Sequence, residues 1–210
     1  MTVDGDDLAA RGAGGTRDRI IDAAQVVFSN KGYPHAGMRE IAARAGVATS
    51  LVTKYFGTKS NLFEQALIDA LAEVDFFQAD RADFGALVVE VTLDRAVRMS
   101  APAMIALSLG DAEARQVAVR VTREHILAPS ARWLGEPDGV ERALNVFMMT
   151  LGLAIVGRTM RDQAAPDADM ATSNRMFAAA LQSLVDHETP TSALTTATPE
   201  SSPPVRRARR

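Results

Sequence analysis

The sequence contains no cysteine among its 210 residues, and this absence excludes disulfide bonds, thiol catalysis and cysteine-ligated metal centres. Its 3 histidines, His35, His125 and His187, lie far apart along the chain and form no metal-ligand spacing. A phosphate-binding loop with its lysine, a nucleophile elbow and other catalytic motifs are also missing. We therefore expect no enzymatic activity, no metal and no cofactor.

Residues 1–15 lack the basic start and apolar run of a secretory signal, because they are acidic and rich in glycine. The longest nearly uncharged apolar run comprises the 15 residues from Ala143 to Gly157. As a helix this run would rise about 22 Å, whereas the core of a bilayer measures about 30 Å. We expect a cytoplasmic protein in which this helix is buried between protein surfaces.

The strict alternation of apolar and polar residues that marks β-strands is absent, while apolar residues recur at helical spacing. Ile20, Ala24 and Phe28 share one face of a first helix, and Phe63 and Leu67 share a face of a later one. With 47% hydrophobic residues, the chain can bury a core, and we expect an all-α protein. Glycine and proline breaks divide it into about nine helices, at residues 16–32, 38–45, 49–56, 58–77, 84–99, 102–109, 112–127, 138–161 and 171–187.

Charge is distributed unevenly, although the formal net charge is only −3. Residues 11–60 carry 8 basic and 3 acidic side chains, whereas residues 61–189 carry 11 basic and 19 acidic ones. All three lysines, Lys31, Lys54 and Lys59, lie in the basic part. A basic module joined to an acidic body indicates that one end of the protein meets a polyanion such as DNA. The alternative is a chance asymmetry in a helical protein.

Residues 40–49 (EIAARAGVAT) have the pattern of a helix-turn-helix, in which a short turn containing glycine joins two short helices. The small side chains of Ala42 and Ala45 allow the two helices to cross closely. Gly46 can adopt the left-handed conformation that ends the first helix. The apolar Val47 can seal the corner between them.

The second helix of this pattern, at residues 49–56, is expected to present a polar side to solvent. That side carries short polar or cationic groups on Thr49, Ser50, Thr53 and Lys54. Such groups bind phosphates and base edges in the major groove of DNA.

The segment MREIAARAGVATSLVTKYFGTKSNLF resembles the amino-terminal domain of the tetracycline-repressor (TetR) family of bacterial transcriptional regulators. It has an Ala-Gly-Val turn, a Tyr-Phe pair at the end of the recognition helix and a Lys-x-x-Leu-Phe entry to the fourth helix. The resemblance runs from about Thr16 to Leu67. It implies a dimeric regulator, most often a repressor, that binds a palindromic operator and is released by a small apolar effector. The alternative is a helical ligand-binding or adaptor protein with a degenerate DNA-binding head.

The resemblance also implies particular DNA contacts. Thr49 and Ser50 open the recognition helix, where family members touch bases or phosphates. Lys54 takes a position facing the groove, and Tyr55 contacts a phosphate or packs against the helix end. Lys59 reaches a phosphate from the positive end of the fourth helix. The full set of expected DNA-binding residues is Arg39, Arg44, Ala48, Thr49, Ser50, Thr53, Lys54, Tyr55 and Lys59.

Two positions depart from the family pattern. Gly37 stands where a helix-capping threonine that touches phosphate is usual. Thr53 stands where a phosphate-binding tyrosine is common, although its hydroxyl can still donate a hydrogen bond. Arg39 and Arg44 have the alternative reading of solvated surface charges, and Phe56 that of a core residue.

The resemblance and the composition together predict four parts. Residues 1–15 are expected to form a flexible arm, residues 16–60 the DNA-binding head, and residues 61–187 the ligand-binding and dimerisation domain. Residues 188–210 are rich in proline, serine and threonine and carry four arginines. We expect them to form a disordered basic tail that adds non-specific attraction to phosphate.

Dimerisation is expected to involve the helix at residues 138–161, which is apolar nearly all round and therefore needs cover on several sides. Together with the last helix it would form a two-fold four-helix interface; a role in the core of one monomer is the alternative. The expected interface residues are Phe147, Leu151, Gly152, Ile155, Met176, Phe177, Leu181 and Leu184.

Bulky and deformable side chains between the middle helices are candidates for a pocket that binds an apolar or amphipathic effector. Plain core packing is the alternative for each of them. Arg95, Arg98, Arg120 and His125 are candidates to orient a carboxylate of the effector. The expected ligand-binding residues are Phe76, Phe77, Phe84, Met99, Met104, Trp133, Phe147 and Met148.

Overall fold

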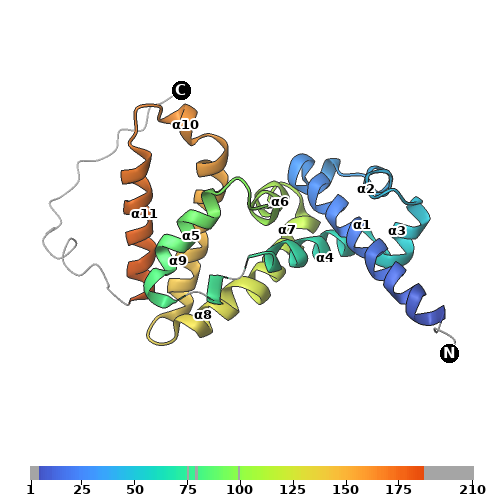
Figure 1. Ribbon diagram of the computed structural model, residues 1–210, viewed down its shortest axis with the longest axis horizontal. Coiled ribbons are helices and arrows are strands. Elements are labelled where there is room, and N and C mark those ends of the chain that lie inside the picture. Colours follow the sequence, from blue (N-terminus) through green and yellow to red (C-terminus); the bar gives the residue numbers. More distant parts are fainter. Residues whose placement is uncertain (1–4, 75, 79, 99, 187–210) are drawn as a thin grey trace, which may run out of the picture.

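The computed structural model describes residues 5–74, 76–78, 80–98 and 100–186, and every secondary-structure element within them is helical. Figure 1 shows an elongated molecule with the amino-terminal helices at one end and α11 at the other. The first part contains α1 (Gly5–His35), α2 (Met38–Ala45), α3 (Thr49–Phe56), α4 (Lys59–Ala72), the 3₁₀ turns η1 (Phe76–Gln78) and η2 (Arg81–Asp83), α5 (Phe84–Leu93) and α6 (Ser100–Ser108). The second part contains α7 (Ala112–Thr122), η3 (Arg123–Leu127), α8 (Ala128–Leu134), α9 (Gly139–Gly152), η4 (Leu153–Gly157), α10 (Arg161–Ala164) and α11 (Met170–Val185).

These elements confirm the all-α fold class, and one difference from expectation lies at the start of the chain. Helix α1 begins at Gly5, so residues 5–15, expected as a flexible arm, form its first turns. The leucine, alanine and arginine residues of this stretch favour helix. The break expected at Gly32 is present, because this residue has φ 74° and ψ 164° inside the helix that runs on to His35.

A second difference concerns the helix expected to end near Leu127, which continues through Pro129 to Leu134. The π turn η3 joins α7 to α8, and Pro129 lies in the first turn of α8. Proline lacks an amide hydrogen and crowds the preceding turn, so the wider π turn accommodates it without ending the helix. The second π turn, η4, extends α9 to Gly157.

The first hydrophobic core joins the amino-terminal helices to α6 and α7. In it the Phe28, Tyr33 and Phe63 rings lie with centroids 5.1 to 6.0 Å apart. Met104 of α6 and Val121 of α7 belong to the same core, which therefore runs across the boundary expected after residue 60. The face of α1 expected from the sequence is buried here through Ile20, Ile21, Ala24, Val27 and Phe28.

The second hydrophobic core lies between α5, α8, α9 and α11. Helices α5 and α11 cross so closely that a Cβ placed on Gly85 would overlap the carbonyl oxygen of Ala178. The amide of Gly85 donates to Oε1 of Gln182 at 2.9 Å, which fixes the register of the two helices. A glycine is therefore required at this crossing.

Arg142 of α9 is buried, and its guanidinium is hydrogen-bonded to backbone carbonyls. Its guanidinium donates to the carbonyl oxygens of Leu134, Gly135, Pro137 and Leu184 at 2.6 to 3.2 Å. These carbonyls lie at the carboxyl ends of α8 and α11 and in the turn before α9, where partial negative charge accumulates. One side chain thus holds three elements of the second core together.

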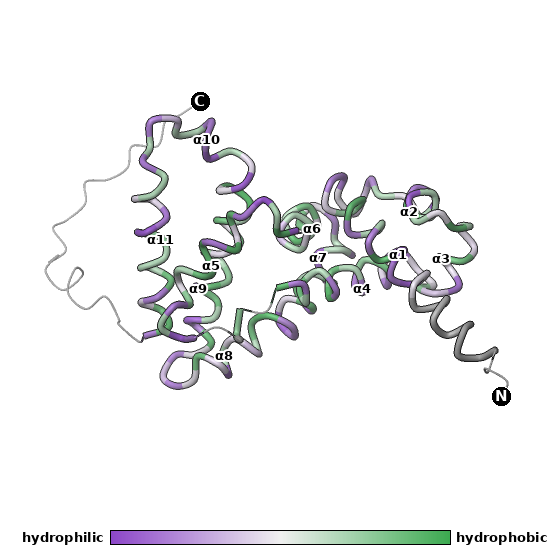
Figure 2. The backbone as a smooth tube through the Cα atoms, in the orientation of Figure 1, coloured by the Kyte–Doolittle hydropathy of each residue, from purple (hydrophilic) through white to green (hydrophobic). Residues whose placement is uncertain are grey.

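The continuous helix Gly139–Gly157 passes a length and composition test for crossing a membrane, a test that core helices also pass. Only 28% of its most apolar window is buried. Figure 2 shows stretches of apolar residues along α5 and α9 and polar residues at the turn after α8. Helix α9 exposes the apolar side chains of Val140, Leu144 and Met148 to solvent.

Candidate nucleic-acid interface and ligand cavity

The turn between α2 and α3 has the geometry expected of a helix-turn-helix. Gly46 is left-handed at φ 68° and ψ 37°, and its amide donates to the carbonyl oxygen of Ala43 at 3.2 Å. Ala42 and Ala45 are buried between the helices. Val47 packs against the first core and donates through its amide to Ala42. Each of these roles was expected from the residue type.

Helix α3 presents its polar side outward. It buries only Val52 and Phe56, so Phe56 is a core residue. The remaining expected DNA-binding positions of this helix and of the residue before it are exposed, except for the half-buried Thr49: they are Ala48, Thr49, Ser50, Thr53, Lys54 and Tyr55.

Three cations near this surface are available to an anion. Within the described part of the chain, the exposed Arg39, Arg44 and Lys54 form no ion pair. Lys31, by contrast, binds Oε1 of Glu40 at 2.6 Å. Because an unpaired lysine or arginine can neutralise a phosphate without breaking an internal contact, these three residues form the electrostatic part of the candidate interface.

Lys59 lies at the junction of the head with the body. Its ammonium stands 4.3 Å from the centre of the Tyr33 ring, and it is half-buried. Burial lowers the pKa of Lys59, while the nearby carboxylates of Asp111 and Glu113 oppose that change. The Tyr33 hydroxyl donates to Oε2 of Glu113 at 2.7 Å. Lys59, for which the family resemblance implies a phosphate contact, therefore also connects α1 and α4 with the start of α7.

The start of α4 carries the expected cap. The Thr58 hydroxyl accepts a hydrogen bond from the amide of Asn61 at 3.1 Å. Further along α4, Glu64 forms an ion pair with Arg120 of α7 at 2.7 Å. These contacts fix α4, the helix that follows the recognition helix, against the body.

Arg17 is a head residue that the sequence reasoning missed. It donates through Nη2 to Oε1 of Gln65 at 2.9 Å, and its guanidinium lies 5.6 Å from the centre of the Phe56 ring. Arg17 thus joins α1 to α4 and to the last residue of the recognition helix. No motif signalled this role, because Arg17 lies outside the segment at residues 38–63 that carries the recognised motifs.

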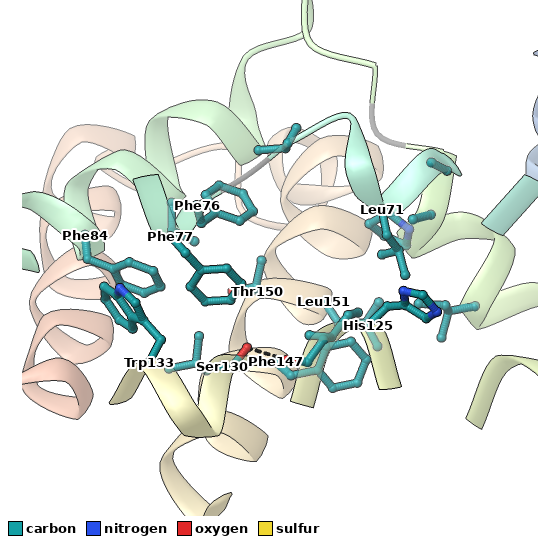
Figure 3. Close-up of a pocket in the computed structure, with 18 of the residues that line it drawn as sticks. Leu71, Phe76, Phe77, Phe84, His125, Ser130, Trp133, Phe147, Thr150 and Leu151 are labelled. Atoms are coloured by element: carbon teal, nitrogen blue, oxygen red, sulfur yellow. Dashed lines mark hydrogen bonds between the residues drawn. The ribbon is translucent and has the colours of Figure 1, made fainter. Parts of the chain in front are cut away.

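A cavity of about 140 Å³ lies between the two cores. Figure 3 shows the Phe76, Phe77, Phe84 and Trp133 rings at one end and His125 at the other. The cavity is lined by Ala70, Leu71, Val74, Phe76, Phe77, Phe84, Val88, Ala101, Pro102, Ile105, His125, Ile126, Ser130, Trp133, Leu134, Val146, Phe147, Thr150 and Leu151.

The expected ligand-binding residues fall into two groups. Phe76, Phe77, Phe84, Trp133 and Phe147 line the cavity. Of the methionines, Met104 is buried in the first core, Met148 is 52% exposed on α9, and Met99 lies outside the described residues.

The charged candidates for ligand orientation are placed apart from the cavity, except for His125. Arg98 binds Asp22 of α1 at 3.1 Å, and Arg120 binds Glu64. Arg95 is exposed and lies 3.8 Å from Asp162. His125 remains as the candidate among them that lines the cavity.

The expected dimer residues are also divided by the structure. Leu181 is fully buried in the second core, while Phe147 and Leu151 line the cavity. Met176 is 70% exposed, and Gly152 has open space beside it. The half-buried members are Ile155, Phe177 and Leu184.

Comparison with known families assigns both parts of the chain. Residues 20–66 match the family described as bacterial regulatory proteins, tetR family. Residues 65–185 match the family described as the Tetracyclin repressor-like, C-terminal domain. The two matches together cover both candidate sites, the recognition helix and the cavity.

Individual relatives agree with this assignment. The HTH-type transcriptional repressor KstR of Rhodococcus jostii (strain RHA1) is 35% identical over 74 residues, and this alignment covers 35% of the chain and 35% of KstR. A TetR-family transcriptional regulator from Rhodococcus sp. has a TM-score of 0.61 at 15% identity, covering 82% of this chain and 99% of that one. The fatty acid degradation regulator FadR from Bacillus halodurans has a TM-score of 0.58 at 20% identity, covering 79% and 94%. At these identities the two structures show a shared fold.

Proposed function

The chain belongs to the TetR family of bacterial transcriptional regulators, and from this premise we propose that it is a cytoplasmic, dimeric repressor. In this proposal it binds a palindromic operator and is released by a small apolar effector. The relative KstR, 35% identical over 74 residues, is named as a transcriptional repressor, which supports repression over activation.

The exposed side of α3 is the observation that carries the DNA-binding proposal. Ser50 and Thr53 stand on this side, and Lys54 adds a cation without an ion pair in the described structure. Polar groups at the start of a helix inserted in the major groove reach base edges, while lysine neutralises a phosphate. Arg39 and Arg44 would add phosphate contacts from α2.

A second copy of the chain is proposed to cover the outer face of α9. Val140, Leu144, Met148 and Val156 are 44% to 66% exposed and are spaced by multiples of four residues, so they form an exposed ridge inclined to the helix axis. Gly152 continues this stripe with open space for a close helix approach. Large contiguous apolar patches exposed on a soluble monomer often mark interaction surfaces. A two-fold axis would place this stripe against the same stripe of the second copy.

The cavity supports the proposed response to an effector because both cores contribute to its wall. Ala70 and Leu71 come from α4, whose first turn follows the recognition helix, whereas Phe84 and Trp133 come from the second core. A ligand that prefers one arrangement of these walls shifts the spacing of the two recognition helices. That differential preference is the thermodynamic requirement for release from DNA.

Binding to the DNA upstream of the protein's own gene tests the proposal. We expect Lys54→Ala to weaken binding and to reduce the salt slope of log K by about 1. Lys31→Ala is the matched control, because Lys31 belongs to the same basic module but is paired with Glu40. Footprinting of the dimer is expected to reveal two half-sites about 10 base pairs apart, centre to centre.

The alternative function predicts a different result. If the wild-type protein and Lys54→Ala bind this DNA with equally low affinity at every salt concentration, the head is degenerate and the chain is a helical adaptor or ligand carrier. Binding of a single half-site by a monomer would instead contradict only the dimer and the palindrome.

A further inference from the structure

We propose that the effector is a compact aromatic molecule, of one ring or a small fused pair, that is uncharged and carries one polar substituent directed at His125. This inference rests on the proposed effector response and specifies the chemical class of ligand. It is carried by the size of the cavity, the arrangement of its rings and the distribution of its polar groups.

The volume limits the ligand to a small molecule. The cavity measures about 140 Å³. An apolar cavity of about 150 Å³ in another protein stays dry and accepts one benzene molecule. A twelve-carbon acyl chain or a four-ring skeleton exceeds this space, so a fatty acid or a sterol would require the two cores to separate.

The ring geometry favours an aromatic guest at one end. The Trp133 ring centroid lies 5.0 Å from that of Phe84 at an interplanar angle of 36°, and 5.6 Å from that of Phe77 at 53°. Tilted rings at these separations form a cage in which a further ring finds both edge and face contacts.

The Trp133 side of this cage is held in place before any ligand binds. The Arg81 guanidinium lies 4.5 Å from the centre of the Trp133 ring and donates to the Trp133 carbonyl oxygen at 2.6 Å. Arg81 is in turn fixed through its own carbonyl, which accepts from Nε2 of Gln182 at 2.8 Å. A cage that is already ordered loses little conformational entropy on binding.

The lining has few polar side chains, namely His125, Ser130, Thr150 and the indole N–H of Trp133. The Ser130 hydroxyl donates to the carbonyl of Ile126 at 2.6 Å and is therefore satisfied within its own helix. His125 is exposed to solvent while it lines the cavity, so it marks the opening (Figure 3). It can donate to or accept from a polar substituent of a ligand that extends from the cage towards this end of the cavity.

Charge excludes the other ligand classes of similar size. The described lining residues include no aspartate or glutamate, so an organic cation would be buried among them without a partner. Among the residues that the structure describes there, no lysine or arginine is present to neutralise a carboxylate. A neutral ring with a hydroxyl, carbonyl or amide substituent is the class that leaves no buried charge unpaired.

Calorimetric titration of the full chain with three probes tests this inference: 4-ethylphenol, ethylbenzene and dodecanoate. We expect 4-ethylphenol to bind about tenfold more tightly than ethylbenzene, as one additional hydrogen bond provides. His125→Phe is expected to remove that difference and to leave ethylbenzene binding unchanged. Trp133 is the single tryptophan of the chain, so its fluorescence reports occupancy of the cage independently.

Two further variants make the test specific to the cavity. Thr150→Phe fills the lining and is expected to abolish binding of both aromatic probes, whereas Val119→Phe, on the exposed surface of α7, is expected to change neither. Circular dichroism confirms that each variant is folded. Tighter binding of dodecanoate than of 4-ethylphenol, or aromatic binding that survives Thr150→Phe, would overturn the inference.

Operator binding by the unliganded protein separates this inference from the proposed function. If the protein binds its operator but none of the probes, the ligand class is wrong while the regulator remains. If the probes bind as expected but no operator is bound, the aromatic cavity stands and the proposed function fails.

Discussion

Arg98 donates through Nη2 to Oε1 of Gln25 at 2.6 Å, in the middle of a polar chain that crosses the first core. Gln25 is fully buried and donates through Nε2 to Oδ2 of Asp69 at 2.9 Å. The chain therefore joins the segment before α6 to α1 and α4. Gln25 has exchanged water for these partners, whereas Arg98 and Asp69 remain exposed to solvent.

Replacement of Gln25 by methionine is expected to destabilise the protein by about 1 kcal/mol, because the hydrogen bonds of Gln25 to Asp69 and Arg98 are lost while these two exposed groups return to water. Urea denaturation followed by circular dichroism measures the change. Gln116→Met, at an exposed position of α7, is the matched control and is expected to have little effect. Equal stability of the two variants would show that these hydrogen bonds contribute nothing to the free energy of unfolding.

Much of the head could be predicted from the sequence because its residues have local requirements. Gly46 was identified because a left-handed helix end favours glycine, and Thr58 because a helix start needs a side-chain acceptor; both roles are present. The buried face of α1, with Phe28 at its centre, followed from helical spacing alone. In each case the sequence pattern specifies both the residue and the environment that it needs.

The body could be predicted only in part, because a helix that is apolar all round has no preferred side in its sequence. Periodicity could not tell which side of α9 packs inward, so Met148 was expected at the cavity although it lies on the exposed side. Met104 was expected there too but is buried beside the head. The packing of Lys59 on Tyr33 depends on two residues far apart in the chain, a relationship that no local pattern carries.

Gly85→Ala is expected to destabilise the fold by about 1–3 kcal/mol, because the new methyl group overlaps the backbone of Ala178 and backbone atoms cannot turn aside. Gly15→Ala is the control: it lies in α1 with no atom within 4 Å of the added carbon. Alanine favours helix over glycine, so the control should gain about 0.5–1 kcal/mol. Thermal denaturation of the two variants should therefore shift in opposite directions, and a Gly85→Ala variant as stable as the wild type would contradict the close crossing.

Tyr33→Phe is expected to cost about 1 kcal/mol at neutral pH, because the buried hydroxyl loses its hydrogen bond to Glu113. Tyr55→Phe, which alters an exposed ring, is the control for this loss. Urea denaturation at pH 7 compares the two variants with the wild type. A Tyr33→Phe variant no less stable than Tyr55→Phe would show that the buried hydrogen bond adds no stability.

The contribution of Tyr33 is also expected to depend on pH. Burial raises the pKa of the Tyr33 hydroxyl in the folded protein, and the hydrogen bond to Glu113 raises it further. Tyrosine in the unfolded chain ionises near pH 10, so above about pH 10 deprotonation favours the unfolded state. The stability advantage of the wild type over Tyr33→Phe should be constant below about pH 9 and should shrink above pH 10. The lowered pKa of Lys59 acts in both proteins and cancels in this comparison.

Met148→Lys is expected to convert the dimer into a monomer without unfolding it. Met148 is 52% exposed in the single chain, so lysine meets solvent there, whereas in the proposed dimer two lysines would face each other across the two-fold axis. Light scattering after size exclusion at micromolar concentration should give the mass of one 22.4 kDa chain for the variant and of two for the wild type. Val119→Lys, at a 60% exposed position of α7, should remain dimeric. Operator affinity should fall only for Met148→Lys, since a monomer holds a single half-site; a Met148→Lys dimer of wild-type affinity would move the interface away from this face of α9.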